Sequence, residues 1–260
     1  MPLSHRLDDM NGLPFYRNFY EQTGIRKENV NSEERVPITL GMIPLEIKSC
    51  LDLGCGDGTI LNKLNPELFK VGLDISHDAL LNAEVEKKVL ACSSRLPFRS
   101  NSYDLVICTE VLEHLPSEQF ELSINEIQRI AKKNILVSVP FQENLDQKQA
   151  CCPNCGFIFH IHMHLRRFNS TQLKTMFTSF SPKYYRFSQT LEKSYPVRIL
   201  EIRRKYGHRW EWDENALCPR CGHKNNHPPR RTPISVLTSI LADIFAKSHP
   251  KWVAVIYEKK

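Results

Sequence analysis

The sequence predicts an α/β fold built on a parallel, doubly wound sheet with helices on both faces. An apolar run, Ser49 to Leu53, ends in a glycine-rich turn, and a helical stretch begins directly after it at Thr59. Further along, apolar runs of strand length alternate with amphipathic runs of helix length, which is the order that produces parallel sheets. Two Cys-Pro-x-Cys-Gly units late in the chain add a metal-binding part to this fold.

The turn after the first strand has glycines at three alternate positions, Gly54, Gly56 and Gly58. Glycine permits backbone conformations that a Cβ would forbid, and it lets a ligand lie directly against the main chain. Asp74 closes the next predicted strand, 20 positions after Gly54, where a carboxylate can accept hydrogen bonds from both hydroxyls of a ribose. Dinucleotide-binding folds share this geometry, but their G-x-G-x-x-G pattern requires a glycine where this chain has Thr59.

The segment before the first strand is predicted to be helical. Asn31 and Glu34 form a capping-box pattern, and the helix that it opens is expected to run to about Lys48. Residues 1–30 carry aromatic pairs and are expected to form a helix packed on the core, or else a lid over the substrate site. The other predicted helices are 60–65, 77–86, 117–132, 171–180 (capped by Ser170), 197–206 and 233–247, and the other predicted strands are 70–74, 105–108, 135–139, 183–191 and 252–257.

Three motifs follow the glycine turn in order. They are RLPF from Arg95 to Phe98, YDLVIC from Tyr103 to Cys108, and EVLEHL from Glu110 to Leu115. Together with the turn and the acid Asp52 before it, they resemble the class I methyltransferases of type 11, which use S-adenosylmethionine, over roughly residues 49–140. The resemblance implies this methyl donor rather than a nicotinamide cofactor. It also implies a Rossmann-like class I methyltransferase sheet with a zinc-binding, four-cysteine insertion after the fifth and sixth strands.

The same resemblance implies three parts of the chain and a set of cofactor contacts. Residues 1–48 are expected to form an N-terminal helical cap, 49–140 the cofactor-binding half of the core, and 141–260 the substrate half with zinc-binding insertions and the last two strands. Relatives with an LPF motif commonly have an acid where this chain has Cys92, so a serine hydroxyl or a backbone carbonyl is expected to receive the adenine amino group, unless 91–94 is only a strand end. The implied cofactor-binding residues are Asp52, Gly54, Gly56, Gly58, Asp74, Ile75, Ser93, Thr109 and Glu110.

The two Cys-Pro-x-Cys-Gly units predict a structural zinc site. Cys152, Cys155, Cys218 and Cys221 supply four thiolates, which close a tetrahedral Zn²⁺ shell with no open position. The 62 residues between the units are no obstacle, because the entropic cost of closing a loop rises only logarithmically with its length. Cys151 is a possible substitute ligand, and iron in place of zinc, or four merely buried cysteines, are the alternatives.

Histidines are the candidates for a catalytic base, which a hydroxyl or protonated amine acceptor requires. His162 and His164 follow the fifth strand, where substrate-binding segments vary among the similar methyltransferases, and on an extended chain they would face the same way as His160. Their alternative roles are zinc ligands or a solvated strand face. His114, within EVLEHL, is the next candidate, although a structural role suits it better.

The expected activity is methyl transfer to a small-molecule or glycan acceptor. The alternative is an RNA or protein methyltransferase that grips a macromolecule with the zinc region and basic residues. The net charge of +6 permits an anionic partner without requiring one, and the absence of an Asn-Pro-Pro-Tyr motif after the fourth strand disfavours methylation of nucleic-acid amines. An intact glycine turn with Asp74 disfavours a non-catalytic scaffold.

A cytoplasmic location is expected, because the first ten residues show no apolar segment of the signal-peptide type and no run reaches the length of a membrane span. The helix 233–247 has an apolar face and follows a basic cluster at His223, Lys224, Arg230 and Arg231. We expect this helix to cover the sheet; the alternative is peripheral contact with an anionic membrane or a lipid-linked acceptor.

Overall fold

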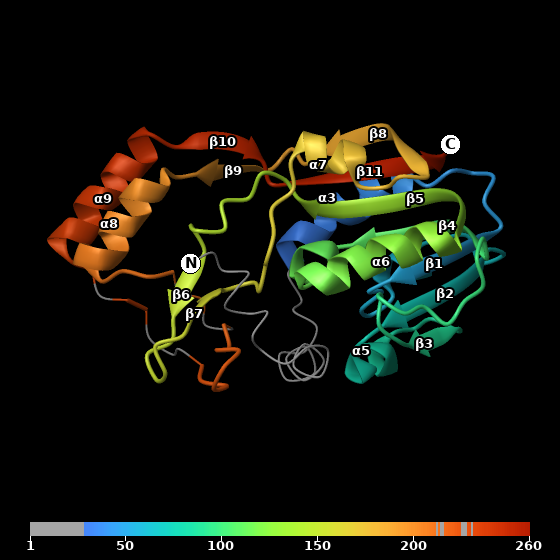
Figure 1. Ribbon diagram of the computed structural model, residues 1–260, viewed down its shortest axis with the longest axis horizontal. Helices are drawn as coiled ribbons and strands as arrows, with labels where there is room; N and C mark the ends of the chain where they lie inside the picture. Colours follow the sequence, from blue (N-terminus) through green and yellow to red (C-terminus); the bar gives the residue numbers. More distant parts are fainter. Residues whose placement is uncertain (1–28, 212, 214–215, 225–227, 230) are drawn as a thin grey trace. The chain divides into compact units, whose positions relative to one another are not determined.

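The computed structural model describes residues 29–211, 213, 216–224, 228–229 and 231–260. It divides into two compact units: unit 1 comprises residues 1–140, 168–188 and 252–260, and unit 2 comprises residues 141–167 and 189–251. Figure 1 labels helices and strands of both units. The predicted aromatic helix or lid of residues 1–30 lies almost wholly outside the described residues, as does Arg230 of the basic cluster.

Unit 1 is built on a seven-stranded sheet in the order β3-β2-β1-β4-β5-β11-β8. The first five strands in this order pair in parallel, whereas β11 is antiparallel to both of its neighbours. This confirms the predicted doubly wound, Rossmann-like sheet. The strands are β1 Ser49–Leu53, β2 Phe69–Asp74, β3 Lys88–Leu90, β4 Tyr103–Thr109, β5 Ala131–Pro140, β8 Phe180–Phe187 and β11 Trp252–Lys259.

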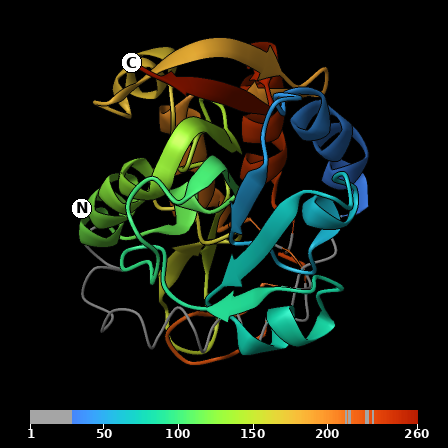
Figure 2. The same ribbon diagram turned by 90° about the vertical axis from the view of Figure 1, so that its right-hand side faces the viewer.

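Helices lie on both faces of this sheet, with α3 on one side and α6 on the other (Figure 2). The helix α6 turns Ile124, Ile127 and Ile130 toward the core at the spacing of one helix face. All seven residues of β4 are buried, as expected for a central parallel strand covered on both faces. The helical segments of unit 1 are α3 Asn29–Gly41, α4 Thr59–Asn62, α5 His77–Asn82, the 3-10 helix η1 Leu112–His114, α6 Ser117–Ile130 and α7 Ser170–Thr175.

Several predicted helix boundaries in unit 1 are wrong. The helices α5 and α7 end at Asn82 and Thr175, before their predicted ends at residues 86 and 180. The helix α3 contains Asn31 instead of starting after it, and it ends at Gly41 rather than near Lys48. The helix α7 is capped by Asn169, whose side chain accepts a hydrogen bond from the backbone of Gln172, and not by Ser170. A capping box explains this choice, because the Gln172 side chain in turn accepts from the Asn169 N–H.

Unit 2 consists of two insertions into the sheet topology, residues 141–167 after β5 and residues 189–251 after β8. The predicted insertions after the fifth and sixth strands are therefore confirmed. The predicted strand 183–191 is wrong, because β8 ends at Phe187 and a separate strand begins at Leu191. No helix in the described part of the chain is long and apolar enough to cross a membrane. The elements of unit 2 are β6 Gln149–Cys151, β7 Ile158–His160, β9 Leu191–Ser194, α8 Val197–Gly207, α9 Pro233–Ile244 and β10 Lys247–Pro250.

Candidate functional site

The three glycines after β1 have positive φ angles but differ in their surroundings. A Cβ on Gly54 would lie 2.3 Å from Val111 Cγ2, and a Cβ on Gly58 would lie 2.4 Å from Val85 Cγ2, so packing excludes a side chain at both positions. A Cβ on Gly56 would meet no atom within 4 Å. Gly56 is therefore the glycine beside open space, where a ligand can approach the backbone.

Asp74 at the end of β2 holds the glycine loop in place. Its Oδ2 accepts a hydrogen bond from the Gly56 N–H at 3.0 Å, and its Oδ1 accepts one from the Ser76 N–H at 2.9 Å. Burial raises the pKa of this carboxyl, and the backbone hydrogen bonds from Ser76, Gly56 and Ile75 act against that rise. A carboxylate has about four acceptor positions, so the three backbone bonds leave room for a further donor such as a ribose hydroxyl. The half-buried Ile75 follows directly.

Two more carboxylates make the loop acidic. Asp57, within the turn, accepts hydrogen bonds from the Thr59 N–H at 3.0 Å and from the Thr59 hydroxyl, so it occupies the first free N–H of α4. Asp52 is 1% exposed, and its Oδ1 has no hydrogen-bond partner among the described residues. Burial, followed by the charge of Asp74, raises the pKa of Asp52 to about 7. The site offers acceptors and negative charge, and it has few donors for a phosphate.

The end of β4 brings a further charged pair close to the sheet edge. Glu110 has a φ of +56, its N–H donates to Ser138 O at 2.9 Å, and its Oε1 accepts from the Ser138 hydroxyl at 3.3 Å. Arg35 of α3 forms an ion pair with Glu110 at 3.2 Å. Thr109, just before, is buried. The strand end therefore places a fixed carboxylate and a buried hydroxyl beyond β4, as open parallel sheets do at their ligand sites.

The expected adenine side follows β3. The Ser93 hydroxyl shares a 2.8 Å hydrogen bond with the Ser123 hydroxyl of α6, so a ligand would have to share or replace this bond. The RLPF segment is fixed by Glu126, which accepts from the Leu96 N–H at 2.7 Å, and by Arg129, which donates to the carbonyls of the segment. An ion pair between Glu126 and Arg129 joins these two contacts.

In unit 2, three histidines gather where β7 ends. His160 is fully buried, and its Nδ1 accepts hydrogen bonds from the backbone N–H groups of His162 and His164, each at 3.3 Å. The rings of His160 and His164 stack with centroids 4.9 Å apart. The prediction of an extended chain here is wrong, because Met163 has a φ of +59 and the backbone turns around His160. The turn, and not strand alternation, brings the three rings together.

A buried carboxylate contacts two of these histidines. Glu143, 1% exposed, has its Oε2 2.5 Å from His164 Nδ1 and its Oε1 3.6 Å from His160 Nε2. Lys148 lies 3.2 Å from the same Oε1 and 2.8 Å from Glu192. Burial, followed by the charge of His164, lowers the pKa of His160 well below its ordinary value, so His160 is neutral. A His164 that donates from Nδ1 to Glu143 has Nε2 as the ring nitrogen that can take up a proton.

The remaining histidine candidate, His114, belongs to unit 1. It ends η1, and its Nε2 lies 3.9 Å from the carboxylate of its neighbour Glu113, which is fully buried. His114 is itself mostly buried, with 18% of its side chain exposed. Both the structural role and the role of a base stay predictions for this residue.

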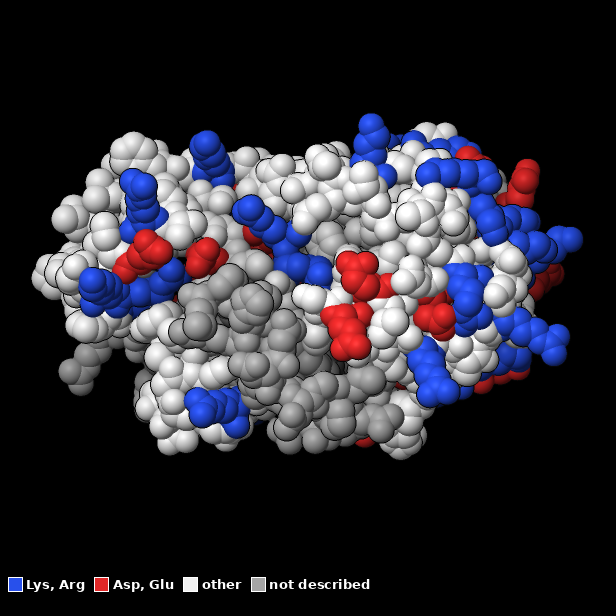
Figure 3. Space-filling model, viewed as in Figure 1, with Lys and Arg blue, Asp and Glu red and all other residues white. Residues whose placement is uncertain are grey.

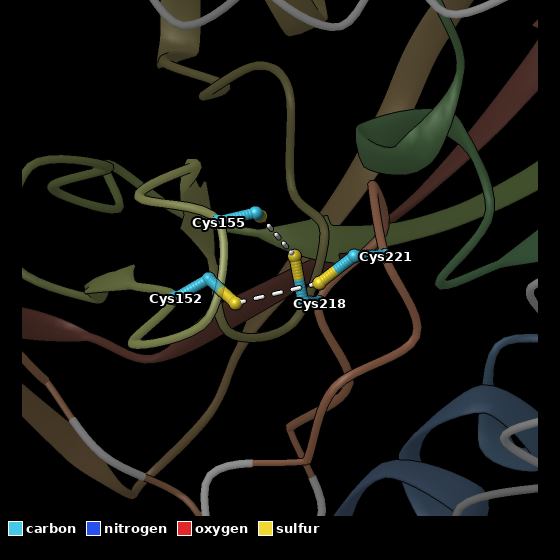
Figure 4. Close-up of side chains that lie close together, drawn as sticks. All are labelled: Cys152, Cys155, Cys218 and Cys221. Carbon is cyan, nitrogen blue, oxygen red and sulfur yellow. Dashed lines mark hydrogen bonds between the residues drawn. The ribbon is translucent and has the colours of Figure 1, made fainter.

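The four predicted metal ligands of unit 2 lie together, with all four sulfurs within 4.8 Å of one another. Figure 4 shows the side chains pointing toward each other from two separate turns. Cys152 Sγ is 3.6 Å from Cys221 Sγ, and Cys155 Sγ is 3.6 Å from Cys218 Sγ. A tetrahedron with Zn–S bonds of about 2.3 Å has edges of about 3.8 Å, so the set has the size and the donor chemistry for zinc.

The two turns have the same construction. In the first, the Gly156 N–H donates to Cys152 O at 2.9 Å, and in the second the Gly222 N–H donates to Cys218 O at the same distance. Both glycines have a φ near +70, at +70 and +69. The Asn154 amide donates to Cys221 Sγ at 3.6 Å and, together with a backbone N–H, lowers the pKa of Cys221 to about 6. These donors favour the thiolate, which is the form that binds metal.

Cys151 lies outside the group of four. Its Sγ contacts Gly156 O at 3.7 Å, and the sulfur cluster found among the described residues contains neither this cysteine nor any histidine. The structure therefore gives no support to Cys151 as a substitute ligand or to the histidines as part of this cluster.

Comparison with known proteins agrees with the geometry of unit 1. A family profile described as "Methyltransferase domain" matches residues 51–138. With β2, β4 and the glycine loop inside that match, the sheet order and the profile point to the same family. Residues 51–138 match a class I methyltransferase domain.

Relatives share this methyltransferase domain more than the rest of the chain. An uncharacterised protein of Methanocaldococcus jannaschii is 32% identical over 144 residues, which is 53% of this chain and 61% of that protein. The ubiquinone biosynthesis O-methyltransferase of Rickettsia bellii is 35% identical over 118 residues, 39% of this chain and 49% of that enzyme. The chain thus spans about half to three fifths of the length of these relatives.

A solved structure extends the likeness in fold to nearly the whole chain. The complex between the Haloferax volcanii Trm112 methyltransferase activator and a methyltransferase matches with a TM-score of 0.57 and 16% identity, covering 94% of this chain and 96% of that one. At this identity the likeness concerns the fold alone.

Several residues that shape these sites were not singled out from the sequence. Arg35, Glu126 and Arg129 are charged residues on helices, and their sequence pattern resembles an ordinary solvated face. Glu143 had a signal, since it follows directly after the fifth strand, at the carboxyl end where ligand sites form. Lys148 had none, because its two partners lie far apart in sequence.

Proposed function

We propose that the chain catalyses the transfer of a methyl group from S-adenosylmethionine to a small-molecule or glycan acceptor. The observation that carries this proposal is the acidity of the glycine loop. Asp52, Asp57 and Asp74 surround it, and Asp57 occupies the N–H of Thr59 that a pyrophosphate would need. S-adenosylmethionine carries a sulfonium and an ammonium charge, which buried carboxylates stabilise, whereas NAD carries an anionic pyrophosphate that they repel.

The residues of the loop then have distinct roles. Asp74 has an acceptor position left for a ribose hydroxyl, and the open side of Gly56 admits the cofactor against the backbone. Asp52 would face the positive charge of the methionine part, while Thr109 and Glu110 flank it beyond β4. When bound, the cofactor supplies an electrophilic methyl group that is transferred in one displacement, so the protein has to align the acceptor and exclude water.

Titration calorimetry with S-adenosylhomocysteine tests this proposal. Asp74→Ala should weaken binding at least about tenfold, because a charge-assisted hydrogen bond to the ribose is lost. Asp74→Asn keeps the acceptor for Ser76 and should lose less, which separates binding from loop collapse. Asp78→Ala, an exposed acid on α5, is the matched control and should bind as wild type does. Heat from NAD with none from S-adenosylhomocysteine would overturn the proposal.

We also propose His164 as the base that takes the acceptor proton, with His162 as an orienting group. The support is the contact from Glu143 to His164 Nδ1, which fixes the tautomer and stabilises the protonated ring. Lys148 forms ion pairs with both Glu143 and Glu192. Its positive charge therefore offsets part of the negative charge beside His164.

Release of S-adenosylhomocysteine in the presence of phenolic, saccharide, RNA and protein acceptors identifies the acceptor class and allows this base to be tested. His164→Gln should lower turnover at saturating cofactor by about 10²- to 10⁴-fold, and Glu143→Gln should lower it less. His162→Gln is expected to raise KM more than it lowers kcat, and the exposed His77→Gln of α5 is the control. Full activity of both the His162 and His164 variants would move the assignment to His114.

We further propose that Cys152, Cys155, Cys218 and Cys221 hold a structural Zn²⁺. The support is a four-sulfur set of tetrahedral size, held by two matching turns whose N–H groups point at the sulfurs of Cys152 and Cys218. A closed set of four thiolates suits a structural site, since it has no open position for substrate or water. The ion would tie residues 151–156 to residues 217–224 within unit 2.

A further inference from the structure

The helix α9 of unit 2 has its apolar and polar faces reversed relative to an ordinary surface helix. Its buried residues are small or polar, Ser235, Thr238 and Ala242. Its large apolar residues are exposed, with Leu237 at 58% and Ile244 at 66%. An ordinary amphipathic helix would show the opposite arrangement, so the large apolar residues of α9 are not buried within unit 2. The expectation that this helix covers the sheet of unit 1 stays a prediction. The exposed apolar residues of α9 and the residue after it are Ile234, Val236, Leu237, Ile240, Leu241, Ile244 and Phe245.

The packing of α9 on α8 explains why this face points outward. The two helices lie side by side (Figure 1), and they approach closely at Gly207, where a Cβ would lie 3.2 Å from the backbone nitrogen of Ser235. The Thr232 hydroxyl, at the N-terminus of α9, donates to Gly207 O at 3.1 Å. Small residues at the contact fix the rotation of α9, and that rotation places its apolar stripe on the surface.

The helix α8 adds apolar and basic side chains to the surface of this helix pair. On α8, Ile202 and Tyr206 are exposed at 46% and 55%. Arg198 and Lys205 of the same helix are also exposed. In Figure 3 the surface over α8 and α9 carries several Lys and Arg groups, a few acids and a stretch of uncharged atoms. Such a combination of an apolar stripe with basic neighbours is typical of helices that lie in a membrane interface.

Charge distinguishes this occupant from the others that an apolar face could take. Unit 2 contains 15 Lys and Arg against 8 Asp and Glu, a net charge of +7, whereas unit 1 contains 20 against 21, a net charge of −1. The whole positive excess of the chain therefore belongs to the unit that exposes the apolar stripe. A second copy would bring two positive units together, and RNA would leave seven apolar side chains without an apolar partner.

We propose that the packed helices α8 and α9 dock on an anionic membrane surface. The apolar residues of α9 enter the boundary between headgroups and acyl chains, and the Lys and Arg side chains of unit 2 contact the anionic headgroups. The 12 residues of α9 extend about 18 Å, which suits a helix lying in the plane of the interface and not one crossing it. This proposal does not depend on the methyl donor or on the acceptor.

Co-sedimentation of the full chain with vesicles tests the docking. Vesicles of phosphatidylcholine mixed with phosphatidylglycerol should bind the protein, more weakly as salt rises, and vesicles of phosphatidylcholine alone should bind it at least about fivefold less tightly. The double variant Leu237→Asp/Ile244→Asp should lose at least about tenfold in partitioning, because two apolar side chains no longer enter the interface. Both positions are exposed, so the variant should keep its fold, which circular dichroism checks.

Controls separate this surface from general stickiness. Leu122→Asp changes an exposed leucine of α6 in unit 1 and should leave vesicle binding unchanged. Failure of the wild type to bind the mixed vesicles, or equal binding by the double variant, would overturn the proposal. A wild-type dimer that the double variant converts to a monomer, or binding of an RNA oligonucleotide, each without vesicle binding, would overturn it in favour of a second copy or of RNA.

Discussion

Unit 1 and unit 2 achieve order by different means. Unit 1 has long strands with continuous apolar burial, such as β4, in which all seven residues are buried. The strands of unit 2 have three or four residues and pair two by two, and such short ribbons have little stability alone. Unit 2 instead collects side-chain clusters, four cysteines in one place and Glu143 with two histidines in another. Burial of a sheet stabilises the first unit, and the proposed metal would cross-link the second.

The strongest test of this contrast is removal of the metal ligands. Cys152→Ser, or chelation of the wild type, should release about one Zn per chain and unfold the knuckle region, because metal binding supplies roughly 10 kcal/mol or more to folding. Hydrogen exchange should rise in peptides covering 149–160 and 217–224 and stay slow in β4 and β5. Cys151→Ser, whose sulfur lies outside the cluster, should keep the metal. A metal-free protein whose unit 2 keeps slow hydrogen exchange, while all four thiols react freely, would contradict this difference between the units.

An intermediate effect is expected from Asp52 in unit 1. Its folded-state pKa of about 7 lies above the ordinary value of 3.8, so the unfolded chain loses this proton first as pH rises. The contribution of Asp52 to the free energy of unfolding is fully present below about pH 4 and is lost between about pH 4 and pH 7. Above about pH 7 the protein is less stable by the full amount, on the order of 1–4 kcal/mol. Asp52→Asn should therefore raise the urea midpoint at about pH 8 and have little effect near pH 4.

The same substitution should act in the opposite sense on ligand binding. If Asp52 faces a cationic cofactor, Asp52→Asn stabilises the unliganded protein and weakens S-adenosylhomocysteine binding in one step. A variant that is no more stable than wild type at about pH 8 would mean that Asp52 is neutral or solvated. In that case the glycine loop would lack the buried negative charge proposed to stabilise the cofactor.

The smallest effect sharpens the contrast with one cap in each unit. Asn169 begins α7 in unit 1 and Thr232 begins α9 in unit 2, and both form capping boxes. Asn169→Ala and Thr232→Ala should each cost about 1 kcal/mol. Hydrogen exchange should localise each loss to its own unit. Equal loss of protection in both units from either variant would show that the two unfold as one.

The sequence predicted unit 1 well because its signals are local. Apolar runs with alternating helices predicted the sheet, and the resemblance implied its Rossmann-like type and its two insertions. The errors lie at ends: Asn169 caps α7 in place of Ser170 because both residues can cap, and only the reciprocal bond with Gln172 decides between them. The three glycines were recognised together, but only neighbours distant in sequence, Val85 and Val111, separate two packing positions from the open one.

Unit 2 was predicted from its cysteines and little else. The knuckle spacing identified four residues that do lie together, since the chemistry of a metal site is written in the residue types. The pairing of Glu143 with His164 depends on a turn at Met163, where no glycine announces a positive φ. The outward face of α9 was invisible for a related reason: an apolar stripe has the same sequence whether it is buried or exposed, and the contact at Gly207 decides.

The threading of unit 2 through unit 1 has a consequence for how the protein is made. The chain passes between the units at residues 140/141, 167/168, 188/189 and 251/252, and β11 is the last strand to be synthesised although it lies between β5 and β8. Cys221 leaves the ribosome before Trp252. Both cysteine pairs are therefore synthesised before β11 can fill its position between β5 and β8. If the four cysteines bind Zn²⁺ as proposed, zinc supply during translation would influence the yield of unit 1, which contains none of these four cysteines.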